Sequence, residues 1–261
     1  MGFIISINNL KGGCGKTTTV QSLAAALTLK GNRCLVVDFD PHGNLSFASH
    51  AGCKEYNFTI YDLMKGTCSF DDVRMVTEYY DIITADFSLY DFRKDFYGEG
   101  QEYVLRNILD PIRNMYDYIL IDTPTSYGIL TINSLIACDY VIMPTEQSFY
   151  ALQGLEQLYE VVKNIQGQFN KNLKILGLLR VKYSEKAKID RFMLGLIDRF
   201  VKEYKIRLFD VSIHESQEVC ISQGMGKSII EFSPRNRISR EYMKLADQIE
   251  WEFAKLEKSI V

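Results

Sequence analysis

Apolar and polar positions along this chain follow two alternating periods, and each period predicts one kind of element. Short apolar runs, typical of buried strands, alternate with longer stretches in which apolar residues recur at helical spacing. Strands are predicted at 3–7, 33–38, 80–84, 118–122, 140–144, 175–181 and 208–213. Helices are predicted at 17–30, 60–65, 101–115, 127–137, 152–169, 189–204 and 239–258. This order predicts an α/β fold, a single-domain doubly wound, mostly parallel sheet flanked by helices over residues 1–261.

A glycine-rich segment follows the first predicted strand directly. Residues 11–19 (KGGCGKTTT) lie between that strand and the first helix. A turn of this kind presents backbone N–H groups to an anion, and the positive end of the helix dipole adds to the attraction. Lysine can reach terminal phosphate oxygens and threonine can ligate Mg²⁺, as in P-loop NTPases. The predicted nucleotide contacts here are Lys11, Gly12, Gly13, Cys14, Gly15, Lys16, Thr17 and Thr18.

The loop carries a second lysine, Lys11, at its start. Lys16 already serves the phosphates of its own chain, so a second cation would crowd them unless it points elsewhere. We therefore expect Lys11 to project toward a facing copy and to act there as an arginine finger does. The simpler alternative is a surface lysine beside a glycine turn.

Carboxylates follow two other predicted strands. Asp38 and Asp40 are spaced i, i+2, so we expect both to project from the same side at the end of their strand. Asp122 ends the strand at 118–122. Ligands of open α/β sheets bind at the carboxyl ends of the strands, which predicts that these carboxylates share the site of the glycine-rich loop. The alternative for Asp40-Pro41 is the start of a turn.

These motifs together resemble the ParA/MinD ATPases, which have a deviant Walker A loop. Residues 11–19 match that loop, and 37–44 (VDFDPHGN) are similar to the family's VDxDPQGN, with His42 in place of glutamine. Residues 122–126 (DTPTS) are similar to DxPPS, with Thr125 in place of proline, and 148–155 (SFYALQGL) to EYYALEGL. No helix-turn-helix precedes the loop, so the chain resembles the short, Soj-like form.

The resemblance implies an ATPase that uses ATP and Mg²⁺, with slow hydrolysis stimulated by a ParB-like partner. It also implies a homodimer that closes around two ATP molecules, with Lys11 acting across the interface. The metal would be held by Thr17 directly and by Asp38 and Asp122 through water. Catalysis is assigned to Asp40, which orients the attacking water, together with Lys11 and Lys16.

Composition limits where such a protein works. No stretch of eighteen apolar residues is present, and the chain enters a strand at residue 3, which predicts neither a spanning helix nor a signal peptide. Six cysteines are scattered without a CxxC pair, which argues against a disulfide framework and structural zinc. We expect a cytoplasmic, nucleoid-associated protein of bacterial or plasmid origin.

Charge is uneven, and it bears on DNA binding. The net formal charge is −3, yet residues 180–207 carry nine basic and four acidic side chains. Members of the family bind DNA nonspecifically through basic residues in the C-terminal third. The predicted DNA contacts are Lys182, Lys186, Lys188, Arg191, Arg235 and Arg237. The alternative is that these charges only solvate an exposed helix.

Residues 213–219 (IHESQEV) depart from the family's IPRNVRL, with Glu215 and Glu218 at two positions that are usually arginine. The change weakens the expectation of DNA contacts there. His214 and Ser216 are predicted base-side nucleotide contacts, with His214 at the pocket rim.

The alternative function is a MinD-like or scaffold ATPase that controls a membrane or protein partner without DNA. The C-terminal tail mixes charge signs and is not lysine-rich, which makes membrane binding unlikely; only Trp251 favours it.

Overall fold

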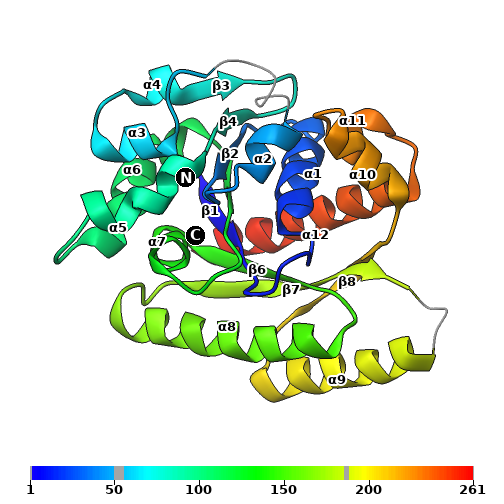
Figure 1. Cartoon of the computed structure of the whole chain (residues 1–261). Helices are drawn as coiled ribbons and strands as arrows, with labels where there is room; N and C mark the ends of the chain where they lie inside the picture. Colours follow the sequence, from blue (N-terminus) through cyan, green and yellow to red (C-terminus); the bar gives the residue numbers. More distant parts are fainter. Residues whose placement is uncertain (1, 50–55, 185–187, 261) are drawn as a thin grey trace.

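One eight-stranded sheet organises the molecule. The computed structural model describes residues 2–49, 56–184 and 188–260. Its strands are β1 (Phe3–Ile7), β2 (Cys34–Asp38), β3 (Arg74–Val76), β4 (Asp81–Ile83), β5 (Tyr118–Asp122), β6 (Tyr140–Thr145), β7 (Lys174–Tyr183) and β8 (Leu208–His214). They run in the order β3-β4-β2-β5-β1-β6-β7-β8 (Figure 1). Only the β3–β4 pair is antiparallel among the pairings that the structure describes, so the predicted doubly wound, mostly parallel sheet is confirmed.

Helices connect the strands and cover both faces of the sheet. The α-helices are α1 (Lys16–Leu29), α2 (Asn44–Ala48), α3 (Ile60–Lys65), α4 (Phe70–Val73), α5 (Phe92–Asp95), α6 (Val104–Ile112), α7 (Ile129–Ala137), α8 (Phe149–Gln168), α9 (Lys188–Tyr204), α10 (Gln217–Gly224), α11 (Ile229–Phe232) and α12 (Arg237–Ile260). Short 3₁₀ helices are η2 (Phe87–Asp91), η3 (Gln101–Tyr103) and η4 (Arg113–Met115). In Figure 1, α8 and α9 lie side by side below the sheet, while α1 and α12 lie against each other above it.

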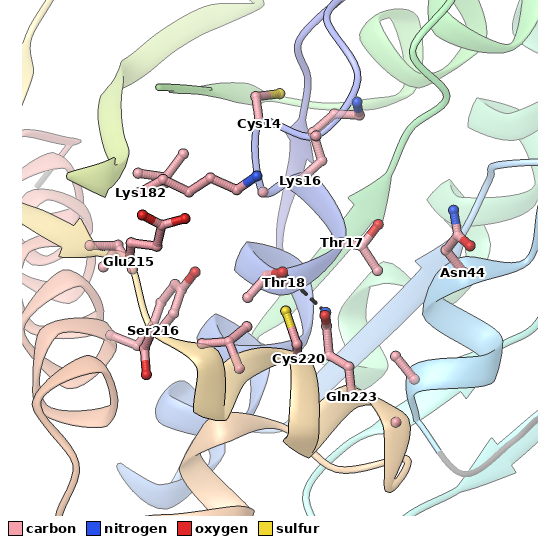
Figure 2. A pocket seen from close by; sticks show the side chains of 18 of the residues that line it. Cys14, Lys16, Thr17, Thr18, Asn44, Lys182, Glu215, Ser216, Cys220 and Gln223 are labelled. Carbon is pink, nitrogen blue, oxygen red and sulfur yellow. Dashed lines mark hydrogen bonds between the residues drawn. The ribbon is translucent and has the colours of Figure 1, made fainter. Parts of the chain in front are cut away.

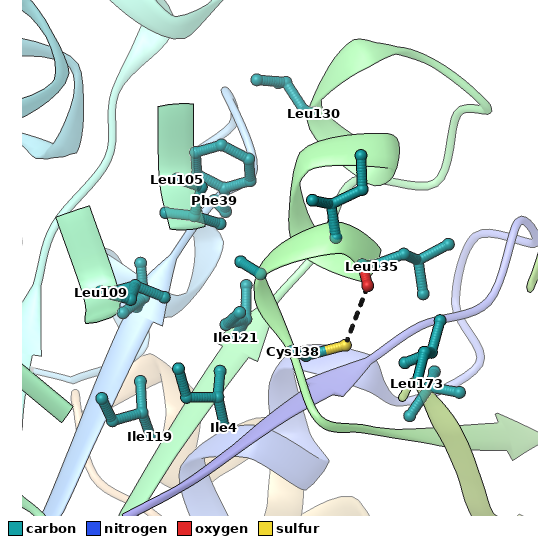
Figure 3. Packing of buried hydrophobic residues seen from close by; sticks show 14 of the residues in the cluster. Ile4, Phe39, Leu105, Leu109, Ile119, Ile121, Leu130, Leu135, Cys138 and Leu173 are labelled. Atoms are coloured by element: carbon teal, nitrogen blue, oxygen red, sulfur yellow. Dashed lines mark hydrogen bonds between the residues drawn. The ribbon is translucent and has the colours of Figure 1, made fainter. Parts of the chain in front are cut away.

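Successive side chains of the central strands pack alternately into two hydrophobic cores, one on each face of the sheet. On β2 and β5, Leu35, Val37 and Ile119 belong to the core beneath α6, α7 and α8 (Figure 3). Val36 and Leu120 belong to the core beneath α1 and α12. Because both faces are covered, these strands are apolar throughout, as the sequence pattern predicts for a parallel sheet.

Several short elements of the fold differ from the sequence prediction. The antiparallel edge strand β3 lies in the segment 44–79, where no strand is predicted, because three residues, two half-buried and one exposed, carry too short a pattern. The short helices α2, α4 and α5 are also absent from the prediction. So are the helices α10 and α11. Their bounds are set by the serine N-caps Ser216 and Ser228 rather than by a long apolar repeat.

Candidate functional site

The glycine-rich loop occupies the carboxyl end of β1. Gly13 and Gly15 have φ angles of 75° and 73°, in the left-handed region that favours glycine. Gly15 is the N-cap of α1, so the loop ends in the free N–H groups of a fourteen-residue helix. Cys14 is fully buried, and its Sγ donates to the Lys11 carbonyl at 3.1 Å. Burial raises the pKa of the Cys14 thiol, which keeps it protonated and packed as a small apolar group.

The two lysines of the loop point to different partners. Lys16 is 6% exposed, and its Nζ donates to the Lys11 carbonyl oxygen at 3.4 Å. The Lys11 side chain turns to the start of α8, where its Nζ pairs with Glu146 and donates to Ser148 Oγ at 2.6 Å. Lys11 is thus held by its own chain, away from Lys16.

Asp122 and Asp38 lie on adjacent strands and face each other in register. The Thr17 hydroxyl donates to Asp122 Oδ2 at 2.7 Å, while Asp122 Oδ1 is buried and has no hydrogen-bond partner among the described residues. Asp38 Oδ2 accepts from the Ser46 backbone N–H at 2.8 Å and from its hydroxyl at 2.7 Å. Burial, then the nearby Asp38 charge, raises the pKa of Asp122 to about 8. Burial raises the pKa of Asp38 to about 6.

These donors fit a hard cation such as Mg²⁺. A buried carboxylate oxygen without a partner is costly unless a cation or water meets it. Among the residues that the structure describes, no three His, Cys, Asp or Glu side chains form a metal-binding group. A site with few protein oxygens suits Mg²⁺, which usually keeps several waters and binds substrate phosphates.

Asp40 follows the end of β2, lies next to Asp38 and begins a turn. β2 ends at Asp38, the Asp40 N–H donates to Asp38 Oδ1 at 3.2 Å, and the Gly43 N–H donates to the Asp40 carbonyl at 2.9 Å. The Asp40 side chain is 11% exposed, and its Oδ1 is hydrogen-bonded to His42. The turn, not strand alternation, directs Asp40 into the pocket.

A cavity of about 530 Å³ joins this end of the sheet to β8 and α10 (Figure 2). Its lining includes Gly13–Thr18 of the loop and α1, and Asp40, and also His214, Glu215 and Ser216. The lining also includes five residues that were not predicted as contacts: Asn44, Phe47, Val181, Cys220 and Gln223. Gln223 Nε2 donates to Thr18 Oγ1 at 3.1 Å across a separation of 205 residues. No local pattern could have indicated such a contact.

The residues predicted to contact the base, His214 and Ser216, are bonded to residues of α10 and α12. The His214 backbone N–H donates to Glu241 Oε2 at 2.8 Å, and the His214 Nδ1 lies 2.7 Å from Glu241 Oε1. Its Nε2 lies 2.6 Å from Arg237 Nη2, so both ring nitrogens are engaged. The ring also meets Tyr183 edge to face at 4.9 Å. Ser216 Oγ accepts from the Glu218 N–H at 3.2 Å and caps α10. His214 and Ser216, the two predicted base contacts, both line the cavity wall.

Lys182 is exposed and also lines the pocket. It has a φ of 51°, unusual for lysine, and it lines the cavity. Its Nζ lies 3.8 Å from the position that a Cβ atom on Gly13 would occupy. Figure 2 shows its side chain extending toward the glycine-rich loop. Lys182 thus lies beside the glycine-rich loop, and its contact with DNA stays a prediction.

The other predicted DNA contacts do not form one cluster. Arg191 is exposed on α9, and Arg235 is exposed between α11 and α12, elements that lie far apart in Figure 1. Arg237 is bonded to Glu241 at 2.8 Å and to His214. Lys188 begins α9, and Lys186 lies outside the described residues.

The C-terminal helix uses its apolar stripe inside the molecule. Leu245, Ile249 and Phe253 of α12 are at most 2% exposed. Trp251 is exposed, but Lys255 Nζ lies 3.1 Å from the centre of its ring. Within the described chain, no helix is both long and apolar enough to cross a membrane.

Several known proteins are similar to this chain in sequence along nearly its whole length. Residues 2–175 match the family model described as an AAA domain. The sporulation initiation inhibitor protein Soj of Bacillus subtilis is 33% identical over 252 residues, which cover 95% of this chain and 98% of that protein. The chromosome partitioning protein ParA of Caulobacter vibrioides is 31% identical over 255 residues, covering 94% and 93%.

A solved structure agrees in fold. Cobyrinic acid a,c-diamide synthase from Mycobacterium smegmatis, solved with bound ADP and magnesium, superimposes with a TM-score of 0.82 at 26% identity. The superposition covers 95% of this chain and 93% of that one.

Proposed function

Because this chain belongs to the ParA/MinD superfamily of P-loop ATPases, we propose that it hydrolyses ATP with Mg²⁺ as a molecular switch. In the ATP form two copies pair, bind DNA nonspecifically and position a plasmid, chromosome or other cargo near the nucleoid. A ParB-like partner stimulates slow hydrolysis. We further propose that residues 1–261 act as one ATPase domain, since the described strands belong to one sheet.

The observation that carries the proposal is the Thr17–Asp122 pair beside the glycine-rich loop. It places a hydroxyl and a buried carboxylate with a free oxygen next to a helix N-terminus. Thr17, Asp38 and Asp122 would hold Mg²⁺, which when bound neutralises charge on the phosphates. The loop N–H groups and Lys16 bind the phosphates, and Asp40 orients the attacking water and accepts its proton.

Pairing of two copies requires Lys11 to change partner. Lys11 and Glu146 are 25% and 22% exposed, and partly exposed ion pairs contribute little stability, so exchange of Glu146 for a facing phosphate is feasible. Asp40→Ala protein with Mg-ATP should elute as a dimer on size exclusion with light scattering. Lys11→Ala in that background should remain monomeric while still binding ATP. A monomeric Asp40→Ala protein at high concentration would contradict pairing.

DNA binding rests on Arg191 and Arg235, which are exposed and have no ion-pair partner among the described residues. Co-sedimentation of the ATP-trapped dimer with DNA should weaken as salt rises. Arg191→Glu with Arg235→Glu should lower the affinity about tenfold and make the salt dependence shallower. Lys163→Glu, an exposed charge reversal on α8, is the matched control and should behave as the parent.

The second candidate is an ATP-controlled scaffold for a protein partner. Glu215 in the cavity wall and the engagement of Arg237 by Glu241 both reduce the positive charge on this side. A membrane partner is less well supported, because the apolar stripe of α12 is buried. A trapped dimer that fails to bind DNA even at low salt would favour this candidate.

A further inference from the structure

His42 holds the side chain of Asp40 from one side. Its backbone N–H donates to Asp40 Oδ1 at 3.0 Å, and its ring Nδ1 lies 2.8 Å from the same oxygen. A nitrogen that faces a carboxylate oxygen carries the proton, so the ring donates to Asp40. Both bonds reach Oδ1, and among the described residues none reaches Oδ2. The second oxygen of Asp40 is therefore the one left to meet a water in the cavity.

The ring of His42 is itself held from the other side. Its Nε2 lies 3.3 Å from the Tyr90 hydroxyl. The ring meets Phe87 and Tyr90 edge to face, with centroids 6.3 and 6.1 Å away. Those two rings stack on each other at 6.1 Å with planes 12° apart. The η2 segment that carries them is capped by Asp86, whose side chain accepts from the Ser88 N–H at 3.0 Å.

Burial of apolar surface does not explain why His42, Phe87 and Tyr90 are held together. The His42 side chain is 58% exposed, and Phe87 and Tyr90 are 68% and 61% exposed, so the group contributes little to the core. The bond to Asp40 is charge-assisted and comes from a ring with a fixed direction. A carboxylate that can rotate would lose the orientation that the attacking water needs.

We infer that His42 is a positioning residue for Asp40. It holds Oδ1 of the Asp40 carboxylate, so that Oδ2 points to the attacking water. The inference rests on the proposed ATPase function. His42 touches neither nucleotide nor metal in this scheme, so it acts on turnover and not on ATP binding. Tyr90 supports the ring from Nε2, and its contribution is smaller because its bond is long.

The test compares three substitutions at saturating Mg-ATP. His42→Phe keeps the aromatic contacts but removes the donor, and kcat should fall about 10-fold to 100-fold, the effect of one hydrogen bond to a charged group. His42→Gln restores a donor of similar reach, and kcat should return to within about threefold of the parent. Tyr90→Phe should lower kcat about twofold to threefold. The ATP dissociation constant, measured with a fluorescent analogue, should not change in any of them.

Two results on kcat would overturn the inference, and so would one on ATP binding. One is a His42→Phe protein with the parent's kcat. The other is a His42→Gln protein as slow as His42→Phe, because that would show that the imidazole does not act as a donor. An increased ATP dissociation constant in His42→Phe would likewise move the role from positioning to binding. A parent protein without ATPase activity would instead contradict the proposed function, so the two failures are distinguishable.

Discussion

The two ends of the nucleotide cavity are built in different ways. The phosphate end comes from one continuous loop and the tips of two strands that are neighbours in the sheet. The base end joins β7, β8, α10 and α12, and its polar groups mostly bind one another, as His214 binds Glu241 and Arg237. The polar groups at the phosphate end are therefore available to a ligand. Those at the base end already have hydrogen-bond partners within the protein. We expect substitutions at the phosphate end to have much larger effects.

The largest effect is expected for Asp40→Ala. Loss of the group that orients and deprotonates water should lower kcat about 100-fold or more, while ATP binding remains. Steady-state phosphate release and equilibrium nucleotide binding measure the two separately. Asp71→Ala, which removes an exposed carboxylate of α4 away from this network, is the control and should leave kcat within about twofold. Unchanged turnover in the Asp40 variant would remove Asp40 from the reaction.

Lys16→Ala comes next. Among the described residues, its buried ammonium is bonded to the Lys11 carbonyl alone, at 3.4 Å, so it is available to a phosphate. Removal should weaken ATP binding about 100-fold, as expected for a charge-assisted contact. Lys11→Ala is the matched comparison within the same loop and should leave binding to the monomer nearly unchanged. Equal losses in the two variants would contradict the separation of roles.

Lys182, which reaches the glycine-rich loop from the end of β7, should respond more weakly. Lys182 is exposed, and Lys182→Ala should weaken ATP binding up to about fivefold, the range of an exposed charge pair. Arg191→Ala should leave ATP binding unchanged. Titration of both variants with a fluorescent ATP analogue measures the two dissociation constants. A Lys182→Ala protein with unchanged ATP binding and weaker DNA binding would support the DNA contact predicted from the sequence.

The same contrast explains what the sequence could predict. The loop, Asp38 and Asp122 were predictable because glycine conformation and parallel strand order bring them together without help from distant side chains. Asp40 was predicted at the right site for an incomplete reason, since a turn and not strand alternation places it. Lys182 was predicted to contact DNA from local charge and the family resemblance, and its place beside the glycine-rich loop was not predicted. Its direction depends on a left-handed backbone at the end of β7, for which lysine carries no sequence signal.

The contacts of Gln223 and the β3 edge strand were not predictable either. The Gln223–Thr18 bond joins elements that only tertiary packing brings together. Three residues of β3 are too few to show a period.

The smallest effect, a dependence of stability on pH, arises at the phosphate end. The pKa values of Asp38 and Asp122 are raised by burial to about 6 and about 8, above the ordinary value of 3.8. The folded state therefore holds protons that the unfolded state has released, which stabilises it at low pH. That stabilisation is lost as pH rises through the folded pKa values. Without divalent cations, Tm should thus fall by a few degrees between pH 5.5 and pH 9.

Differential scanning fluorimetry in EDTA measures this fall. Asp122→Asn removes the more strongly shifted group and should flatten the dependence on pH, while changes at all other groups cancel in the comparison. Added Mg²⁺ should raise Tm of the parent most at high pH, because a cation stabilises the ionised pair. A parent Tm that rises with pH in EDTA, or an Asp122→Asn protein with the same slope, would mean that these carboxylates are ionised without a metal. The phosphate end would then differ less from the base end than the structure indicates.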